Sequence, residues 1–255
     1  MEYYTEVKLM GDAYGAGFSN GLTMCGSQSA AAFRKVEDMG PDAVYDDDRQ
    51  HRIVLHKKAA GQAVEVSTEF INDSAEAVTL EMLSSFAIRG INADRIHRLQ
   101  SFWSAEGKLR TESIEELHLE PSWNRCGMRV EKFGNVGSMP VRKYFPFLVV
   151  EDSKKQEFLG IQLYCPSSWQ IEILCKDDDT LTIAGGIADR DFGHWMKKLS
   201  PGEKFVTPKA VIAGGNTLYE VCDKLVKAQK PAISDVDKKM GIAFNEYCTT
   251  WGNPS

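Results

Sequence analysis

Residues 144–184 read YFPFLVVEDSKKQEFLGIQLYCPSSWQIEILCKDDDTLTIA, and this stretch decides the fold class. It opens on a dense run of aromatic and β-branched residues, 144–150, which are typical of strands. Three more apolar runs follow at intervals of about ten residues, at 158–164, 169–175 and 180–184. Short strands at regular spacing, with turn residues between them, predict a sandwich or barrel and not alternating β and α units.

The first third of the chain has the same pattern. Residues 51–56 (HRIVLH) and 63–70 (AVEVSTEF) are joined by a turn at Gly61, and the turn residues 72–74 (NDS) precede 78–83 (VTLEML). These runs alternate apolar and polar residues with a period of two, as half-buried strands do. We therefore expect one mainly β domain over residues 1–215.

One segment has helical periodicity instead. Residues 216–230 (NTLYEVCDKLVKAQK) place apolar side chains at 218, 221, 222, 225 and 226. Asn216 or Thr217 is suited to cap its start, lysines fill its last turn, and Pro231 ends it. The sequence predicts a helix here, within a short helical linker over residues 216–240.

The C-terminal residues resemble the beginning of another domain. After the polar stretch 234–239, the apolar run 241–244 (GIAF) is typical of a buried strand. A buried strand at the very end of a chain has nothing after it to pair with. We therefore expect residues 241–255 to form the first strand of a domain that is cut short, and residues after about 231 to pack poorly or lie extended.

The composition excludes several classes of function. The 255 residues carry a net charge of −6 with a pI near 5.5, which argues against a nucleic-acid partner because phosphate binding requires a clustered positive surface. No stretch approaches the roughly 18 apolar residues of a membrane span. The N-terminus, MEYYTE, lacks the features of a signal peptide, so a cytoplasmic protein is expected.

Cysteine, glycine and acidic clusters give no specific cofactor signature. The six cysteines lack paired metal-site spacing, and buried free thiols are expected. Gly11 to Gly17 and Gly185-Gly186 match no phosphate-binding motif and are interpreted as turn and bulge glycines. Asp46-Asp47-Asp48 and Asp177-Asp178-Asp179 lack the alternate spacing of a calcium loop, so hairpin tips are the preferred interpretation. We expect neither a metal nor a cofactor.

Two aromatic segments are compatible with sugar binding. Glu120-Pro121-Ser122-Trp123 and Gly193-His194-Trp195 place aromatic faces beside hydrogen-bonding groups. Tryptophans of a sandwich core bury a large area each, and the core interpretation is preferred for both segments. His194 is likewise interpreted as structural. Hydrolysis of a glycosidic bond requires two carboxylates, and spacing alone identifies no such pair, so no catalytic residue is assigned.

The order of several motifs resembles a known family. Residues 134–147 (GNVGSMPVRKYFPF), 188–195 (ADRDFGHW), 199–205 (LSPGEKF) and the pair Thr207-Pro208 follow one another as in the N-terminal domain of glycoside hydrolase family 36, the bacterial α-galactosidases and their relatives. Residues 70–74 and 98–107 also look similar, and 244–251 looks like the first strand of the family's barrel. The likeness covers nearly the whole chain.

The resemblance implies a large antiparallel β-supersandwich of the galactose mutarotase type, followed by a short helical linker and one terminal strand of a (β/α)8 catalytic barrel. In this family two aspartates hydrolyse α-galactosides with retention, and both lie on later barrel strands that this chain does not contain. The chain alone is therefore expected to be inactive. The resemblance also implies a homo-oligomer, and it places Trp251 and Asn245 near the substrate at the C-terminal face of the barrel.

Two other functions remain open at this point. One is a stand-alone carbohydrate-binding or structural sandwich module. The other is a mutarotase-like sugar enzyme that acts within the sandwich, with His194 or His118 beside a carboxylate.

Overall fold

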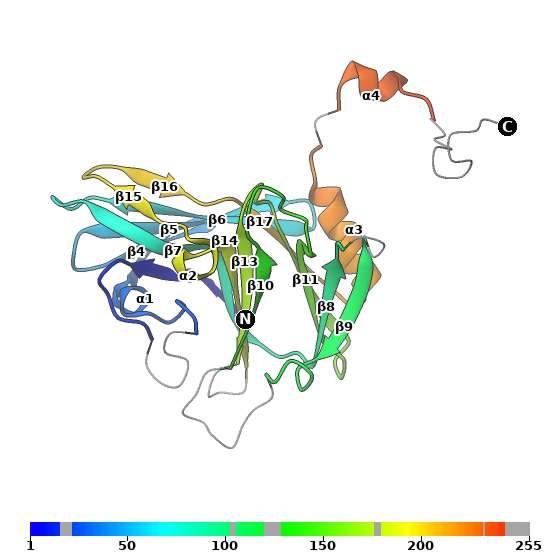
Figure 1. Cartoon of the computed structure of the whole chain (residues 1–255), viewed down its shortest axis with the longest axis horizontal. Coiled ribbons are helices and arrows are strands. Elements are labelled where there is room, and N and C mark those ends of the chain that lie inside the picture. Colours follow the sequence, from blue (N-terminus) through cyan, green and yellow to red (C-terminus); the bar gives the residue numbers. More distant parts are fainter. Residues whose placement is uncertain (16–21, 103–105, 120–128, 176–179, 232, 243–255) are drawn as a thin grey trace.

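Two antiparallel sheets face each other in the computed structural model of the chain, which describes residues 1–15, 22–102, 106–119, 129–175, 180–231 and 233–242 (Figure 1). The seven-stranded sheet has the order β1 (Glu2–Tyr4), β7 (Val78–Ile91), β14 (Leu181–Ile187), β13 (Trp169–Cys175) and β10 (Arg129–Asn135). Two short strands, β2 (Val7–Leu9) and β15 (Lys197–Leu199), also pair with the long strand β7.

The second sheet has ten strands. Its order is β3 (Arg34–Met39), β4 (Asp42–Asp46), β5 (His51–Ala60), β6 (Ala63–Asn72), β17 (Ala210–Gly215), β12 (Glu157–Leu163), β11 (Tyr144–Asp152), β8 (Arg95–Gln100) and β9 (Lys108–Ser113). The short strand β16 (Lys204–Val206) pairs with β6. All the pairings in both sheets are antiparallel, and the prediction of a mainly β sandwich is confirmed.

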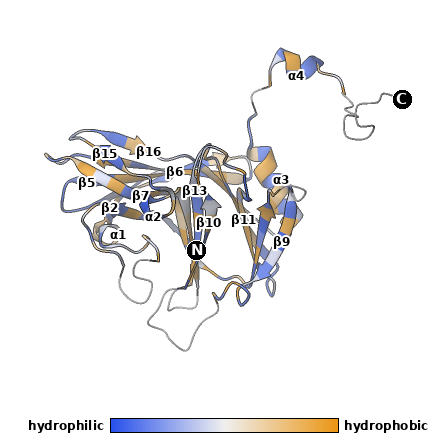
Figure 2. Cartoon of the chain, viewed as in Figure 1, coloured by the Kyte–Doolittle hydropathy of each residue, from blue (hydrophilic) through white to orange (hydrophobic). Residues whose placement is uncertain are grey.

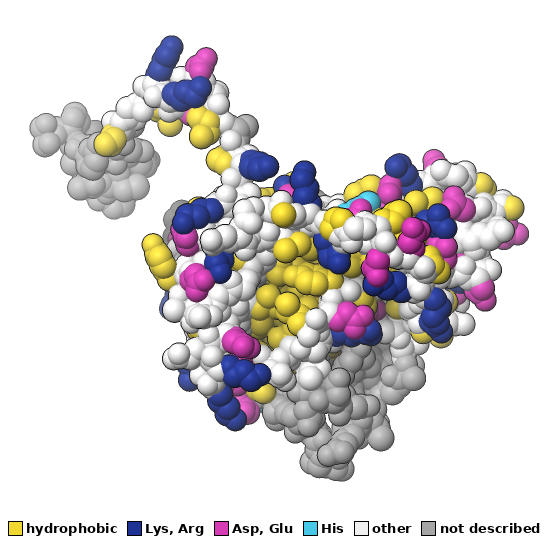
Figure 3. Space-filling view, turned by 180° about the vertical axis from the view of Figure 1, so that it is seen from behind, with side chains coloured by type: hydrophobic (Ala, Val, Ile, Leu, Met, Phe, Trp, Pro, Cys, Tyr) yellow, Lys and Arg dark blue, Asp and Glu magenta, His cyan; other side chains and the backbone are white. Residues whose placement is uncertain are grey.

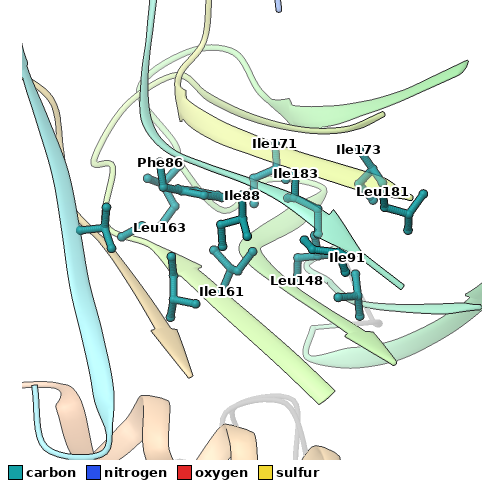
Figure 4. Close-up of a cluster of buried hydrophobic side chains, with 14 of the residues drawn as sticks. Phe86, Ile88, Ile91, Leu148, Ile161, Leu163, Ile171, Ile173, Leu181 and Ile183 are labelled. Atoms are coloured by element: carbon teal, nitrogen blue, oxygen red, sulfur yellow. The ribbon is translucent and has the colours of Figure 1, made fainter. Parts of the chain in front are cut away.

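The largest core cluster lies between the two sheets (Figure 4). Ile88, Ile171 and Ile183 come from the seven-stranded sheet, and Leu148 and Ile161 come from the ten-stranded sheet. All five are fully buried. Burial of each such side chain contributes about 1.5–3 kcal/mol, so the inward-facing positions of the alternating runs hold the two sheets together.

Seven strands were predicted from the alternating runs, and each run corresponds to a strand. The runs 144–150, 158–164, 169–175 and 180–184 correspond to β11, β12, β13 and β14. β5 and β7 extend well beyond the predicted runs. β7 has 14 residues because it pairs with β2 and β15 along one half and with β1 and β14 along the other.

The predicted helix is confirmed as α3 (Leu218–Ala228). The Thr217 hydroxyl accepts a hydrogen bond from the backbone N–H of Glu220 at 3.1 Å, so Thr217 is the cap and Asn216 is not. Val221 and Leu225 are buried in a cluster with β11 and β17 side chains. The helix thus packs on the face of the ten-stranded sheet that points away from the main core.

Three shorter helices complete the described residues: α1 (Gln28–Ala32), α2 (Arg190–Gly193) and α4 (Asp235–Lys239). α1 and α2 were not predicted, because four or five residues are too few to show a 3.6-residue period. α4 falls within the linker expected over residues 216–240, and a capping box between Ser234 and Asp237 stabilises it.

The expected loose packing after residue 231 is confirmed as far as the structure describes it. Residues 233–242 are all exposed, and α4 lies away from the sandwich, with both hydrophobic and hydrophilic residues on its surface (Figures 1 and 2). Gly241 and Ile242 are exposed and belong to no strand, and the rest of the predicted terminal strand lies outside the described residues. No helix in the described ranges is long and apolar enough to cross a membrane.

The space between the sheets opens to the surface at one side. A cavity of about 450 Å³ there is lined by Ile91 of β7, Val150 of β11, and Phe158 and Leu159 of β12. Seen from behind, the molecule has a hollow lined by hydrophobic side chains and surrounded by charged residues (Figure 3).

Candidate functional site on the seven-stranded sheet

Several residues singled out by sequence lie outside the described residues. These are Asn245 and Trp251, the segment from Glu120 to Trp123, and the cluster from Asp177 to Asp179. Their assignment to substrate binding, to the core or to a hairpin tip therefore stays a prediction.

The two candidate histidines are not paired with a carboxylate among the residues that the structure describes. His194 is exposed and ends α2 in the left-handed conformation, with φ of 57°. His118 is exposed too, with φ of 55°. Neither ring forms an ion pair with a described carboxylate. Trp195 next to His194 packs against Phe205, with ring centroids 5.5 Å apart, in agreement with the core interpretation.

Asp189, at the start of the ADRDFGHW motif, is fully buried, and its carboxylate accepts three hydrogen bonds. Its carboxylate accepts from the backbone N–H of Phe192 at 2.7 Å, which caps α2. It also accepts from Lys132 Nζ at 3.0 Å and from Gln170 Nε2 at 2.9 Å. Its own backbone N–H donates to Gln170 Oε1 at 2.8 Å. The motif is therefore anchored onto β10 and β13.

Lys132 joins Asp189 to a second buried carboxylate. Glu172 Oε1 lies 2.9 Å from Lys132 Nζ, and Glu172 also accepts hydrogen bonds from Gln170 Nε2 and the Thr23 hydroxyl. Burial lowers the pKa of Lys132, but the carboxylates of Glu172 and Asp189 outweigh it and hold that pKa above its ordinary value. Burial raises the pKa of Glu172 against the pull of Lys132.

A neighbouring pair extends this charged network across the sheet. Lys8 of β2 and Glu81 of β7 form an ion pair at 3.0 Å, with only 2% and 1% of their side chains exposed. Arg190 of α2 binds the other oxygen of Glu81 and the hydroxyl of Tyr14, and that hydroxyl donates to Asp191 at 2.7 Å. The network therefore ties the N-terminal segment to the resemblance motif.

The chemistry of this network is structural. Each of its buried carboxylates is paired with a cation: Glu81 with Lys8, and Glu172 and Asp189 both with Lys132, so removing one member is expected to be destabilising. Burial also raises the pKa of the nearby Cys25 thiol, which keeps it protonated and unreactive. Within the described ranges, no group of three His, Cys, Asp or Glu residues is arranged to hold a metal ion.

Sequence reasoning missed this network. Two of its charged residues interrupt an apolar run: Lys8 stands between Val7 and Leu9, and Glu172 between Ile171 and Ile173. A charge at the outward position of a strand normally indicates a solvated face. In β2 and β13 the outward positions are buried too. The sequence signal for this burial was that the residues on both sides of each charge are apolar.

The resemblance motifs at 70–74, 199–205 and 207–208 are also structural. The Asn72 amide, at the end of β6, donates to the carbonyl oxygens of Glu76 and Leu199. The Asn72 backbone forms hydrogen bonds with Gly202 and Glu203 of the segment 199–205. Thr207 exchanges two hydrogen bonds with the Thr68 backbone. The conspicuous sequence motifs thus hold turns of the sandwich together.

The predicted interpretations of the acidic and glycine clusters hold where they are described. Asp46, at the end of β4, pairs with Arg52 on β5 at 2.8 Å, and Asp47 accepts from the His51 ring and backbone in the turn between these strands. This is a hairpin tip. Gly185 and Gly186 lie on β14 where its register with β7 shifts, which is a bulge.

Asp12 connects this hairpin tip to the N-terminal segment. Both of its carboxylate oxygens accept from the Arg49 guanidinium at 2.9 Å, and one also accepts from the Ser29 hydroxyl at 2.7 Å. Burial raises the pKa of Asp12, but the hydrogen bonds from Arg49 and Ser29 outweigh it and hold that pKa below its ordinary value.

Asp12→Asn is therefore expected to destabilise the protein in a pH-dependent manner. A depressed pKa contributes stability that is present above the unfolded value, about 3.9, and is lost as the pH falls through the folded value. We expect the free energy of unfolding of the variant to be about 1 kcal/mol lower than that of the unsubstituted chain at pH 7. This difference is expected to shrink below pH of about 4. Urea unfolding at a series of pH values measures it, with Asp48→Asn, an exposed carboxylate beside Arg49 in the hairpin tip, as control. A difference that stays constant down to pH of about 3 contradicts the role of Asp12.

Solved α-galactosidases of glycoside hydrolase family 36 share this fold. A variant of AgaA from Geobacillus stearothermophilus, in complex with raffinose, superposes with a TM-score of 0.61 at 16% identity, covering 89% of this chain and 29% of that chain. The α-galactosidase from Lactobacillus brevis gives 0.56 at 16% identity, covering 84% and 26%. The galactosidase domain of the α-galactosidase–sucrose kinase AgaSK gives 0.58 at 12% identity, covering 85% and 27%.

These superpositions establish the fold and its extent. The chain spans less than a third of the length of these enzymes, while most of the chain is covered. No family model and no curated protein matches the sequence. The predicted resemblance to family 36 is confirmed at the level of the sandwich fold.

Proposed function

We propose that this chain is the non-catalytic β-domain of a retaining α-galactosidase-like glycoside hydrolase and that it supports the catalytic barrel of the parent enzyme. The observation that carries the proposal is the extent of the superposition: 89% of this chain corresponds to 29% of the α-galactosidase AgaA. The hydrolytic aspartates then belong to the parent's remaining part, as the family resemblance implies.

The charged network supports a scaffolding role. A retaining glycosidase needs two carboxyl groups about 5–5.5 Å apart, both facing an open site where the sugar binds. Glu172 and Asp189 are the buried carboxylates that come together on one cation, and the Lys132 ammonium occupies the position between them. Such a network fastens the N-terminal segment and α2 to the sheet, and its two carboxylates bind a buried ammonium instead of facing an open site.

The substrate and assembly of the parent are part of this proposal. AgaA structures hold stachyose and raffinose, so an α-galactoside is the substrate class that we propose for the parent. Asn245 and Trp251 would then lie near that sugar at the mouth of the barrel. A homo-oligomer in the cytoplasm, without nucleic acid, membrane or cofactor, is the setting that composition and resemblance favour.

The purified 255-residue chain is expected to show no hydrolysis of p-nitrophenyl α-galactoside above the buffer rate. The polypeptide encoded by the complete reading frame of the parent gene is expected to hydrolyse it. Absorbance of released nitrophenolate measures both. Turnover by the chain alone, abolished by His194→Ala or His118→Ala, would overturn the proposal in favour of a sugar enzyme of mutarotase-like fold whose active site lies within the sandwich.

A stand-alone carbohydrate-binding module is the second candidate. It would share the sandwich and the absence of hydrolysis. The two are separated by the reading frame downstream of Ser255: a continuation of several hundred codons that encodes a barrel supports the scaffold, and a stop codon favours the module.

A further inference from the structure

The segment 136–143, between β10 and β11, is held in place from three directions. The Ser101 backbone N–H donates to the carbonyl oxygen of Lys143 at 2.9 Å, and its hydroxyl donates to that of Val141 at 3.2 Å. The Trp169 indole N–H donates to the carbonyl oxygen of Pro140 at 2.6 Å. The Gly137 N–H donates to the Ser168 hydroxyl at 2.9 Å. This surface loop is therefore preformed.

A buried arginine makes the base of the loop rigid. Arg98 of β8 has only 3% of its side chain exposed and binds Glu112 and Glu131. Its guanidinium lies 5.0 Å from the Phe133 ring centroid and 5.3 Å from that of Tyr144. These two aromatic residues stand on β10 and at the start of β11, on either side of the loop, so both ends of the loop have a fixed spacing.

A pocket of about 580 Å³ opens beside this loop. This volume lies within the range of about 300–1,000 Å³ that is typical of small-molecule sites. Phe102 and Val136 line it with 66% and 45% of their surfaces exposed. The Gln100 amide supplies hydrogen-bonding groups, whereas the Asn135 amide donates to the carbonyl oxygen of Met139 inside the loop; Arg142 and Lys143 supply two adjacent positive charges.

The charges of this pocket differ from those of the protein as a whole. The chain carries a net charge of −6, yet no Asp or Glu is among the described residues that line the pocket. Arg142 and Lys143 are both exposed, and neither is ion-paired with a described carboxylate. Two such cations at the rim of a concave surface favour an anionic ligand.

The remaining lining favours a sugar. An exposed aromatic ring offers an apolar face for the apolar face of a pyranose, while the neighbouring Gln100 amide is able to bond its hydroxyl groups. We propose that this pocket binds a sugar ring carrying one anionic substituent, a phosphate or a carboxylate. The ring would stack on Phe102, and the anion would be bound by Arg142 and Lys143.

NMR titration of the isotope-labelled 255-residue chain tests this site. The probes are galactose 6-phosphate, galacturonate, galactose and inorganic phosphate, with glucose 6-phosphate and glucuronate in parallel. The choice of galactose rests on the proposed function, whereas the glucose series does not. We expect saturable shifts at the amides of Gly134 and Gly137, and affinity for an anionic sugar about tenfold higher than for neutral galactose.

Two variants separate the ring from the anion. Phe102→Ala is expected to weaken binding of every sugar by roughly tenfold, with Tyr219→Ala, an aromatic residue 83% exposed on α3, as the matched control. Arg142→Ala/Lys143→Ala is expected to abolish the preference for anionic over neutral sugars. Lys197→Ala/Lys198→Ala, which removes two exposed lysines on β15, is the charge-matched control.

Each outcome decides the proposal. The proposal is supported if an anionic sugar of either series binds the chain, and if this binding is lost in the pocket variants and kept in both control variants. This holds whether or not the parent enzyme hydrolyses galactosides. The phosphate sugars and the uronates distinguish the two anions. No saturable shift with any probe, equal affinity for inorganic phosphate alone, or binding unaffected by the pocket variants would overturn it.

Discussion

Asp189→Ala is expected to lower the free energy of unfolding by about 3–5 kcal/mol, which is typical when one partner of a buried ion pair is removed. The substitution removes a fully buried carboxylate that Lys132 and Gln170 both bind. It also removes the N-cap of α2. The ammonium of Lys132 then keeps Glu172 as its buried partner but loses one of its two carboxylates. Urea denaturation followed by circular dichroism measures the change.

Two neighbouring substitutions show whether the loss belongs to the network. Asp191→Ala removes a carboxylate from the same helix, but its side chain is 41% exposed, so a loss of at most about 1 kcal/mol is expected. Asp189→Asn keeps an oxygen able to cap α2 and is expected to fall between the two. Equal losses for Asp189→Ala and Asp191→Ala would mean that the buried network does not stabilise the sheet.

Gly160→Ala is expected to destabilise the protein by about 1–3 kcal/mol, as overpacking of a filled core does. A Cβ at Gly160 of β12 would lie 2.2 Å from Val221 Cγ1 and 3.2 Å from Leu225 Cδ1. Both residues are the buried face of α3. The added methyl group therefore pushes the helix off the ten-stranded sheet. Thermal or urea unfolding measures the loss.

A control and a double-mutant cycle locate this effect. Gly214→Ala on the adjacent strand β17 introduces a Cβ whose nearest neighbour is 3.8 Å away, so little change is expected. Val221→Ala removes the clashing methyl groups. We therefore expect Gly160→Ala to be less destabilising in the Val221→Ala background than in the unsubstituted chain. Additive losses, or an equal loss for Gly214→Ala, would contradict close packing of α3 on Gly160.

The class of the fold could be predicted from the strands because their signal is local. The apolar run predicted for β13 begins at the first residue of that strand, and the run predicted for β14 begins one residue before it. Strand length was less predictable. The extension of β7 through Ile91 depends on β1 and β14, which lie far away in the sequence and supply its partners.

The candidate site was less accessible from sequence. The motif containing Asp189 was recognised by resemblance, but its partners Lys132 and Gln170 have no spacing that connects them to it. His194 and Trp195 attracted attention by type, and the structure places His194 at an exposed helix end and Trp195 against Phe205. The pocket beside Phe102 was not predicted, because its lining comes from three separate segments.

The sequence alone determined that this chain is a β-rich sandwich with one amphipathic helix. The physical reason is that the side-chain period of a strand or helix is set by the backbone of that element and is visible within a few residues. Only the tertiary structure decided which charged residues are buried together. Arg190 meets Tyr14 across 176 positions, and Thr23 meets Glu172 across 149, through contacts that exist only when the sheet has formed.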